Sequence, residues 1–133
     1  MDGGGGMIRP HFRVWDIKNK LMLNLRLINF EESYVEAYDG DWYRFDEVVL
    51  IQSTGLKDKY GVEIYESDII VNHVGDVWVI TYFRGAFRYY PIESYSKDKE
   101  KLFETDNIGN FGTEAFEVIG NIYADKYLMD VTE

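Results

Sequence analysis

Apolar and polar residues alternate along much of the chain, and this period of two predicts strands. The clearest case is Leu21–Phe30 (LMLNLRLINF), whose odd-numbered leucines fall on one face while Arg26 and Ile28 fall on the other. The other predicted strands are His11–Trp15, Ser33–Tyr38, Trp42–Phe45, Val48–Gln52, Glu63–Tyr65, Asp68–Val71, Val77–Phe83, Phe87–Ile92 and Phe116–Tyr123. The sequence therefore predicts a mostly β protein.

Turn residues between these segments predict hairpins. Asp39-Gly40-Asp41 and Arg84-Gly85-Ala86 each separate two short strands, and Ser53–Gly61 is predicted to be a polar connection. Short strands with turns about eight to twelve residues apart are typical of sandwiches and barrels. We expect a single domain over residues 7–133, with a β meander at 7–52 and an SH3-like, partly open barrel at 53–133.

Little helix is expected, and it falls near the C-terminus. The charged stretch Lys97–Thr105 fits one short helix, and Asp125 could N-cap a final helical turn through Val131. At the other end, residues 1–6 (MDGGGG) are expected to be a flexible, non-native leader, because four consecutive glycines have no side chains to pack.

Composition supports the β prediction and limits the chemistry. Aromatic residues make up 17% of the chain, with 11 Tyr, 8 Phe and 3 Trp, and such side chains pack well on a pleated surface. Cysteine is absent, which excludes disulfides, thiolate metal ligands and cysteine nucleophiles. No apolar run approaches the ~20 residues of a membrane span. A soluble cytoplasmic protein, without membrane contact, is expected.

The net charge of −10 argues against general nucleic-acid binding. Residues 1–66 carry 8 basic and 12 acidic side chains, and residues 67–133 carry 6 and 12, so the acidity is spread along the chain. Binding to a phosphate backbone depends on Lys and Arg side chains that neutralise phosphates. The simplest interpretation is that the acidic charge keeps a small domain soluble.

No catalytic or metal-binding motif emerges from the sequence. Without cysteine, the two histidines, His11 and His73, leave only mixed His/carboxylate sets as metal sites, and a solvated turn is a better account of His73 than a site with Asp68 or Asp76. The acidic pairs are Asp39/Asp41, Asp46/Glu47 and Glu66/Asp68, and neighbouring pairs are expected by chance among 24 acidic residues. We expect no enzyme activity, no cofactor and no metal.

One segment, 82–90 (YFRGAFRYY), combines aromatic and basic residues on a predicted hairpin. Its candidate binding residues are Tyr82, Arg84, Arg88 and Tyr90, with Arg88 and Tyr90 on one face by alternation. Three interpretations remain open. Alternate aromatics such as Phe87 and Tyr89 fill a core while the arginines face solvent, or the hairpin binds a protein, or its rings stack on single-stranded nucleic acid.

Four ordered blocks resemble a known family. They are Phe12–Asp16 (FRVWD), Thr54–Lys59 (TGLKDK), Glu63–Ile69 (EIYESDI) and Phe116–Tyr123 (FEVIGNIY). Together they are similar to the YopX family of small phage and prophage proteins of Gram-positive bacteria, over nearly the whole chain from Arg9. The resemblance implies a mostly β accessory protein and brings no catalytic residues. With the aromatic excess, it favours a non-catalytic protein-binding or self-associating module, with a nucleic-acid-binding barrel as the alternative.

Two positions depart from that family pattern. Ser67 stands where members usually have glycine, and Tyr60 stands where a turn residue such as Asn is usual. If the glycine adopts a positive φ, Ser67 is expected to carry backbone strain. Gly120, inside FEVIGNIY, predicts a bulge or a close backbone approach.

Overall fold

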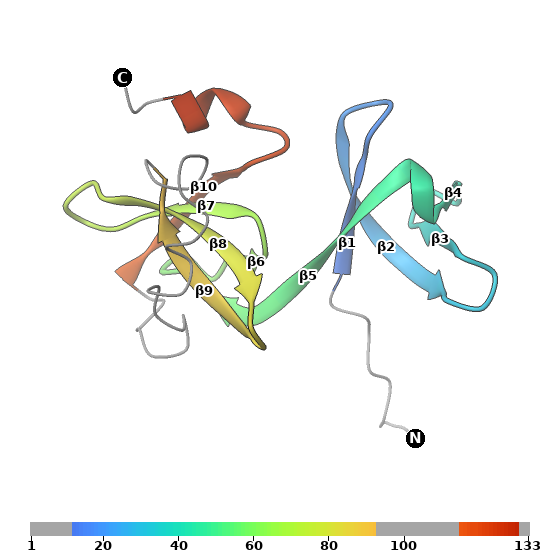
Figure 1. Ribbon diagram of the computed structural model, residues 1–133, viewed down its shortest axis with the longest axis horizontal. Coiled ribbons are helices and arrows are strands. Elements are labelled where there is room, and N and C mark those ends of the chain that lie inside the picture. The colour runs from blue at the N-terminus through green and yellow to red at the C-terminus, as the bar shows by residue number, and fades with distance from the viewer. Residues whose placement is uncertain (1–11, 93–114, 131–133) are drawn as a thin grey trace. The chain divides into compact units, whose positions relative to one another are not determined.

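The computed structural model describes residues 12–92 and 115–130, which form two antiparallel sheets (Figure 1). The strands are β1 (Phe12–Asp16), β2 (Leu21–Asn29), β3 (Tyr34–Ala37), β4 (Trp42–Arg44), β5 (Val48–Lys57), β6 (Glu63–Tyr65), β7 (Asp68–Val71), β8 (Val77–Phe83), β9 (Ala86–Pro91) and β10 (Glu117–Asn121). Their order is β4-β3-β2-β1-β5-β6 in one sheet and β10-β7-β8-β9 in the other. The prediction of a mostly β chain is confirmed.

The chain divides into two compact units, one up to Leu50 and one from Ile51 onward. β5 contributes residues to both, and it extends through Lys57 into the segment predicted to be a polar connection. Its pairing with β6 skips two residues between Ser53 and Leu56, where Gly55 has a φ of +79°. Within the described residues neither sheet closes into a barrel, and the SH3-like character of residues 53–133 stays a prediction.

The first unit buries one face of its meander. Its buried cluster contains Val14, Leu25, Val35 and Val48, with Leu23 and Ile28 packed against it. The register pairs Val14 with Leu23 and Val35 with Ile28, which brings these side chains to the same face.

A β-bulge corrects the simple alternation predicted for β2. The pairs Leu25–Ala37 and Leu27–Glu36 leave Arg26 as an extra residue. One extra residue exchanges the two faces of a strand, so Ile28, rather than Leu27, packs against the buried cluster. At the start of the strand, Leu21 is exposed instead of buried.

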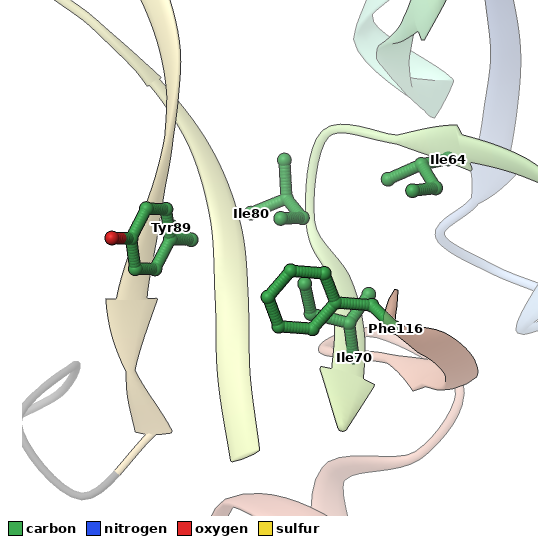
Figure 2. Close-up of a cluster of buried hydrophobic side chains, with 5 residues drawn as sticks. All are labelled: Ile64, Ile70, Ile80, Tyr89 and Phe116. Carbon is green, nitrogen blue, oxygen red and sulfur yellow. The ribbon is translucent and has the colours of Figure 1, made fainter. Parts of the chain in front are cut away.

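The second unit has two buried clusters. Figure 2 shows the first, in which Ile64, Ile70, Ile80, Tyr89 and Phe116 gather, with the Tyr89 hydroxyl directed away from the other four side chains. The second contains Ile69, Val79 and Ile92. Neighbouring residues of β7 and β8 thus enter different clusters, so the central strands of the smaller sheet are covered on both faces.

A buried aspartate ties the loop after β5 to β10. Asp58 accepts hydrogen bonds from the N–H groups of Tyr60 and Val62, both at 2.8 Å, and from that of Val118 at 2.9 Å. Burial opposes its ionisation, but these three backbone donors outweigh that effect and lower the pKa of Asp58. The TGLKDK block therefore has an architectural role.

Gly120 lies at a bulge, as predicted. Ile119 is the unpaired residue between the pairs Val118–Ile70 and Gly120–Ile69. A Cβ atom on Gly120 would lie 2.5 Å from Asp125 Oδ2, so any other residue here would force this carboxylate to shift.

The Asp125 side chain has a different hydrogen-bond partner from the one expected of a helix N-cap. A 3-10 helix spans Lys126–Asp130, but the Asp125 carboxylate accepts from the preceding N–H of Asn121 at 3.0 Å instead of from amides that follow it. The helix predicted at 97–105 and the leader at 1–6 lie outside the described residues. No helix in the described part of the chain is long and apolar enough to cross a membrane.

Candidate binding surfaces

The β8–β9 hairpin places the four predicted binding residues in different environments. Tyr82 is 49% exposed and packs edge-on against Phe87, with ring centroids 4.9 Å apart. Arg84 is exposed at the turn, and its guanidinium lies 5.6 Å from the centroid of the Phe83 ring. These contacts lie at the tip of the hairpin, so the tip is the exposed part of this segment.

The other two predicted residues do not form an open face. Arg88 is half-buried, and its Nε donates to the carbonyl of Phe83 at 2.9 Å. Tyr90 is 1% exposed and pairs with Val79, so it cannot belong to a binding surface. By alternation Arg88 and Tyr90 point to the same face of β9, but that face is covered at Tyr90, so the candidate binding residues do not share one exposed surface.

Two of the acidic pairs contribute a carboxylate that holds a turn together. Asp39 Oδ1 accepts from the Asp41 N–H at 2.9 Å, and the buried Asp68 accepts from the Tyr65 N–H at 2.8 Å. His73 is exposed in a turn, and His11 lies outside the described residues. Among the described residues no group of three or more His, Asp or Glu side chains could hold a metal ion.

Sequence reasoning missed an aromatic surface on the first unit. Trp42 of β4 is 66% exposed, and its indole stacks on the Tyr34 ring with centroids 4.6 Å apart and planes 11° apart. The register Trp42–Glu36 and Tyr34–Arg44 makes the two rings diagonal neighbours on one face. The intervening Tyr43 packs against the buried cluster on the other face.

An open groove of about 460 Å³ runs beside Trp42. Its lining comes from two turns and an edge strand: Asp16, Ile17, Lys18, Asn19, Trp42, Tyr43, Asp46 and Glu47. Asp16 orders the first turn by accepting from the N–H groups of Lys18 and Asn19, both at 3.1 Å, and from Asn19 Nδ2 at 2.8 Å. These residues belong to one unit, so the groove is complete within it.

The groove lining carries three acidic side chains, Asp16, Asp46 and Glu47, and one basic side chain, Lys18. Burial raises the pKa of the Tyr43 hydroxyl, and the nearby carboxylates of Asp39, Asp41, Asp16 and Glu47 raise it further. Desolvation opposes ionisation of Asp16, yet its hydrogen bonds with Asn19 and Lys18 lower its pKa, so this carboxylate stays charged at neutral pH. A positive group is therefore the favoured occupant.

Strand β4, at the edge of the larger sheet, is partly closed to strand addition. The bonds from Ala37 N–H to Asp41 O and from Phe45 N–H to Ser33 O show that the backbone groups of Trp42 and Arg44 point away from β3. The N–H of Arg44, however, donates to Glu47 Oε1 at 2.8 Å. This cap, together with the short length of the strand, limits pairing with another strand.

Little in the sequence distinguishes this surface. A tryptophan directly after the Asp39-Gly40-Asp41 turn is the one signal that could have indicated it. The alternation of β4 does not show which face is solvent-exposed, because that depends on the strands that cover the other face.

Comparisons with known proteins agree on family and fold. The model of the YopX protein family matches residues 11–130. The crystal structure of protein EF1440 from Enterococcus faecalis is 27% identical, with a TM-score of 0.60, over 93% of this chain and 100% of that one. The crystal structure of YopX from Bacillus subtilis is 20% identical, with a TM-score of 0.54, over 88% and 95% of the two chains, and supports the fold. A search of curated proteins found no match.

Proposed function

Because the chain belongs to the YopX protein family, we propose that it is a phage- or prophage-encoded accessory protein that acts in the cytoplasm of the bacterial host as a non-catalytic protein-binding module. The proposal combines the family resemblance with the exposed aromatic surface of the first unit. It treats Asp39 and Asp68 as structural, since each carboxylate accepts a hydrogen bond from a backbone N–H in a turn.

The observation that carries the proposal is the exposed Trp42–Tyr34 stack. Tryptophan and tyrosine are enriched at positions that dominate binding energy, because they offer a large, rigid surface with an apolar body and a polar group. Stacking on Tyr34 holds the indole in one orientation before any partner arrives. Such preorganisation reduces the entropy lost on binding.

The observed charge and burial favour a protein partner over nucleic acid. The net charge of −10 disfavours phosphate contacts, and the burial of Tyr90 removes one of the rings proposed for base stacking. The alternative of a nucleic-acid-binding hairpin has no further observation in its favour.

Photo-crosslinking in bacterial cells tests the proposal. The full chain would carry p-benzoylphenylalanine in place of Trp42, with a matched control in which the same residue replaces Tyr60, which is 68% exposed in the other unit. We expect a discrete crosslinked protein from position 42 and not from position 60.

Light scattering of the purified protein over a concentration series would then show whether that partner is a second copy of the chain. Equal, diffuse crosslinking from both positions in a protein that remains monomeric would overturn the proposed function.

A further inference from the structure

We propose that the groove beside Trp42 binds an arginine or lysine side chain presented by an extended basic segment of a partner protein. The inference rests on the proposed function, since it names the chemistry of the partner. Three features of the groove support it: a largely exposed tryptophan in its lining, lining carboxylates, and apolar side chains in the same lining.

The indole of Trp42 offers a binding face for a cation. Tyr34 covers one face of the ring by stacking, and the side chain is nevertheless 66% exposed. The opposite face is therefore open, and Trp42 also lines the groove. A guanidinium or ammonium group over the face of a tryptophan is attracted by the quadrupole of the ring, and tryptophan is the best of the aromatic side chains for this contact.

Carboxylates line the same groove as Trp42. Asp16, Asp46 and Glu47 line the groove against a single lining cation, Lys18. Arg44 pairs with Asp46 at 3.1 Å and with Glu47 at 4.0 Å, in contacts with both partners substantially exposed. Such exposed pairs contribute little and exchange readily. A carboxylate can also accept about four hydrogen bonds, so Asp46 and Glu47 can receive a second cation.

The groove also suits the hydrocarbon part of a long basic side chain. Ile17 is 50% exposed and lines the groove with Trp42 and the half-buried Tyr43. Lys and Arg pack their methylene groups on apolar surface while the charged end reaches polar partners. An arginine lying over Ile17 would thus place its guanidinium between the indole and the carboxylates.

The edge of the sheet favours recognition by side chains rather than by strand pairing. The N–H of Arg44 donates to Glu47 Oε1, so a strand added at β4 would have to break that cap. If β4 paired with β4 of a second copy of the chain, the bond from Arg44 to Glu47 would have to break in both copies, because a symmetric interface repeats every contact. A basic segment that inserts side chains leaves the cap intact.

A peptide titration of the full chain, followed by NMR, tests the inference. The probe is an acetylated and amidated Gly-Arg-Gly-Arg-Gly peptide, and the readout is the indole N–H resonance of Trp42 with the amides of Tyr43, Asp46 and Glu47. A citrulline peptide is the matched control, because citrulline keeps the shape of arginine without its charge. We expect at least about tenfold weaker binding of the citrulline peptide. We also expect the arginine peptide to bind more weakly as salt rises from about 0.1 M to 1 M, which shortens the Debye length from about 10 Å to 3 Å.

Variants separate the groove from the rest of the acidic surface. Asp46→Asn/Glu47→Gln removes two charges while glutamine can still accept the cap from Arg44. Glu31→Gln/Glu32→Gln removes the same charge in the turn between β2 and β3, away from the groove lining. We expect the first double variant to weaken binding of the arginine peptide about tenfold and the second to leave it within about twofold.

The outcomes distinguish this inference from the proposed function. Equal binding of the arginine and citrulline peptides, equal effects of the two double variants, or resonance changes confined to the second unit would each overturn the basic-segment inference. If position 42 still crosslinks one discrete protein, the proposed function stands and only the partner chemistry is wrong. If position 42 yields no discrete crosslinked protein and the arginine peptide shows no charge-dependent binding, both the proposed function and the basic-segment inference are wrong.

Discussion

Replacing Ser67 by glycine should stabilise the protein. Ser67 has a φ of +74°, in the left-handed region that favours glycine, and the side chain is 5% exposed. Its conformation is held from both sides, because its N–H donates to the carbonyl of Ile80 at 2.7 Å and its carbonyl accepts from Ile122 at 3.0 Å. The Ser67 hydroxyl, in addition, is buried without a hydrogen-bond partner among the described residues. The expected strain at this departure from the family glycine is therefore present.

The net effect follows from four contributions to the free energy of unfolding. The left-handed conformation costs an L-residue about 1–2 kcal/mol. An unsatisfied buried hydroxyl costs about 1 kcal/mol at the low end of its range. Two effects of glycine lower the stability. The greater freedom of the unfolded chain costs about 0.4–1 kcal/mol. The loss of a buried methylene costs about 0.8 kcal/mol. We expect Ser67→Gly to stabilise by about 1 kcal/mol, a rise in Tm of about 3–5 °C.

Urea unfolding followed by circular dichroism, together with thermal melts, would measure this change. An unchanged denaturant slope would show that the midpoint reports stability alone. Ser67→Ala is the matched control, because it removes the hydroxyl and keeps the Cβ atom in the left-handed conformation. The difference between the alanine and wild-type proteins reports the hydroxyl, and the difference between glycine and alanine reports the backbone. A glycine variant less stable than the wild-type protein would refute the reasoning.

Three further predictions follow from the buried polar contacts. Asp58→Ala should destabilise the protein by about 3 kcal/mol in urea unfolding, because it removes a buried carboxylate that accepts from three backbone N–H groups; a loss below about 0.5 kcal/mol would contradict the role of this carboxylate. Gly120→Ala should lower Tm, since the added Cβ meets the Asp125 carboxylate at 2.5 Å, and Gly120→Ala/Asp125→Ala should recover part of the loss. Because the folded-state pKa values of Asp16 and Asp58 are lowered, their contribution to stability is complete above the usual Asp pKa of about 3.9 and is lost as pH falls below it. Urea midpoints measured from pH 6 down to pH 2.5 should therefore fall below about pH 4, less steeply in Asp58→Asn; a flat profile would be inconsistent with these pKa shifts.

Local chemistry in the sequence was enough for several features of the fold. Alternation located the strands, and turn residues separated them, since both depend on neighbours in the chain. Gly120 indicated its bulge because a glycine inside a strand is otherwise unfavourable. The family resemblance made Ser67 suspect, and its positive φ confirms that expectation.

The candidate site depended on contacts that no local pattern contains. The four residues chosen on the β8–β9 hairpin shared a chemical character, but Tyr90 is buried while Tyr82 is exposed. In the first unit, Trp42 was a candidate binding residue only once the structure showed that it stacks on Tyr34. The structure also showed that it lines a groove with the turn at Asp16, which is distant in sequence.

The sequence by itself determined the β class, most strand positions and the bulge at Gly120, because these follow from side-chain period and steric limits within a few residues. The tertiary structure decided which face of each strand is buried. The extra residue at Arg26 exchanges the faces of β2, and a second covering layer buries Tyr90 as well as Tyr89. Alternation fixes only that neighbouring side chains point to opposite faces, and whether a face meets solvent or a core is set by strands that pair and pack from elsewhere in the chain.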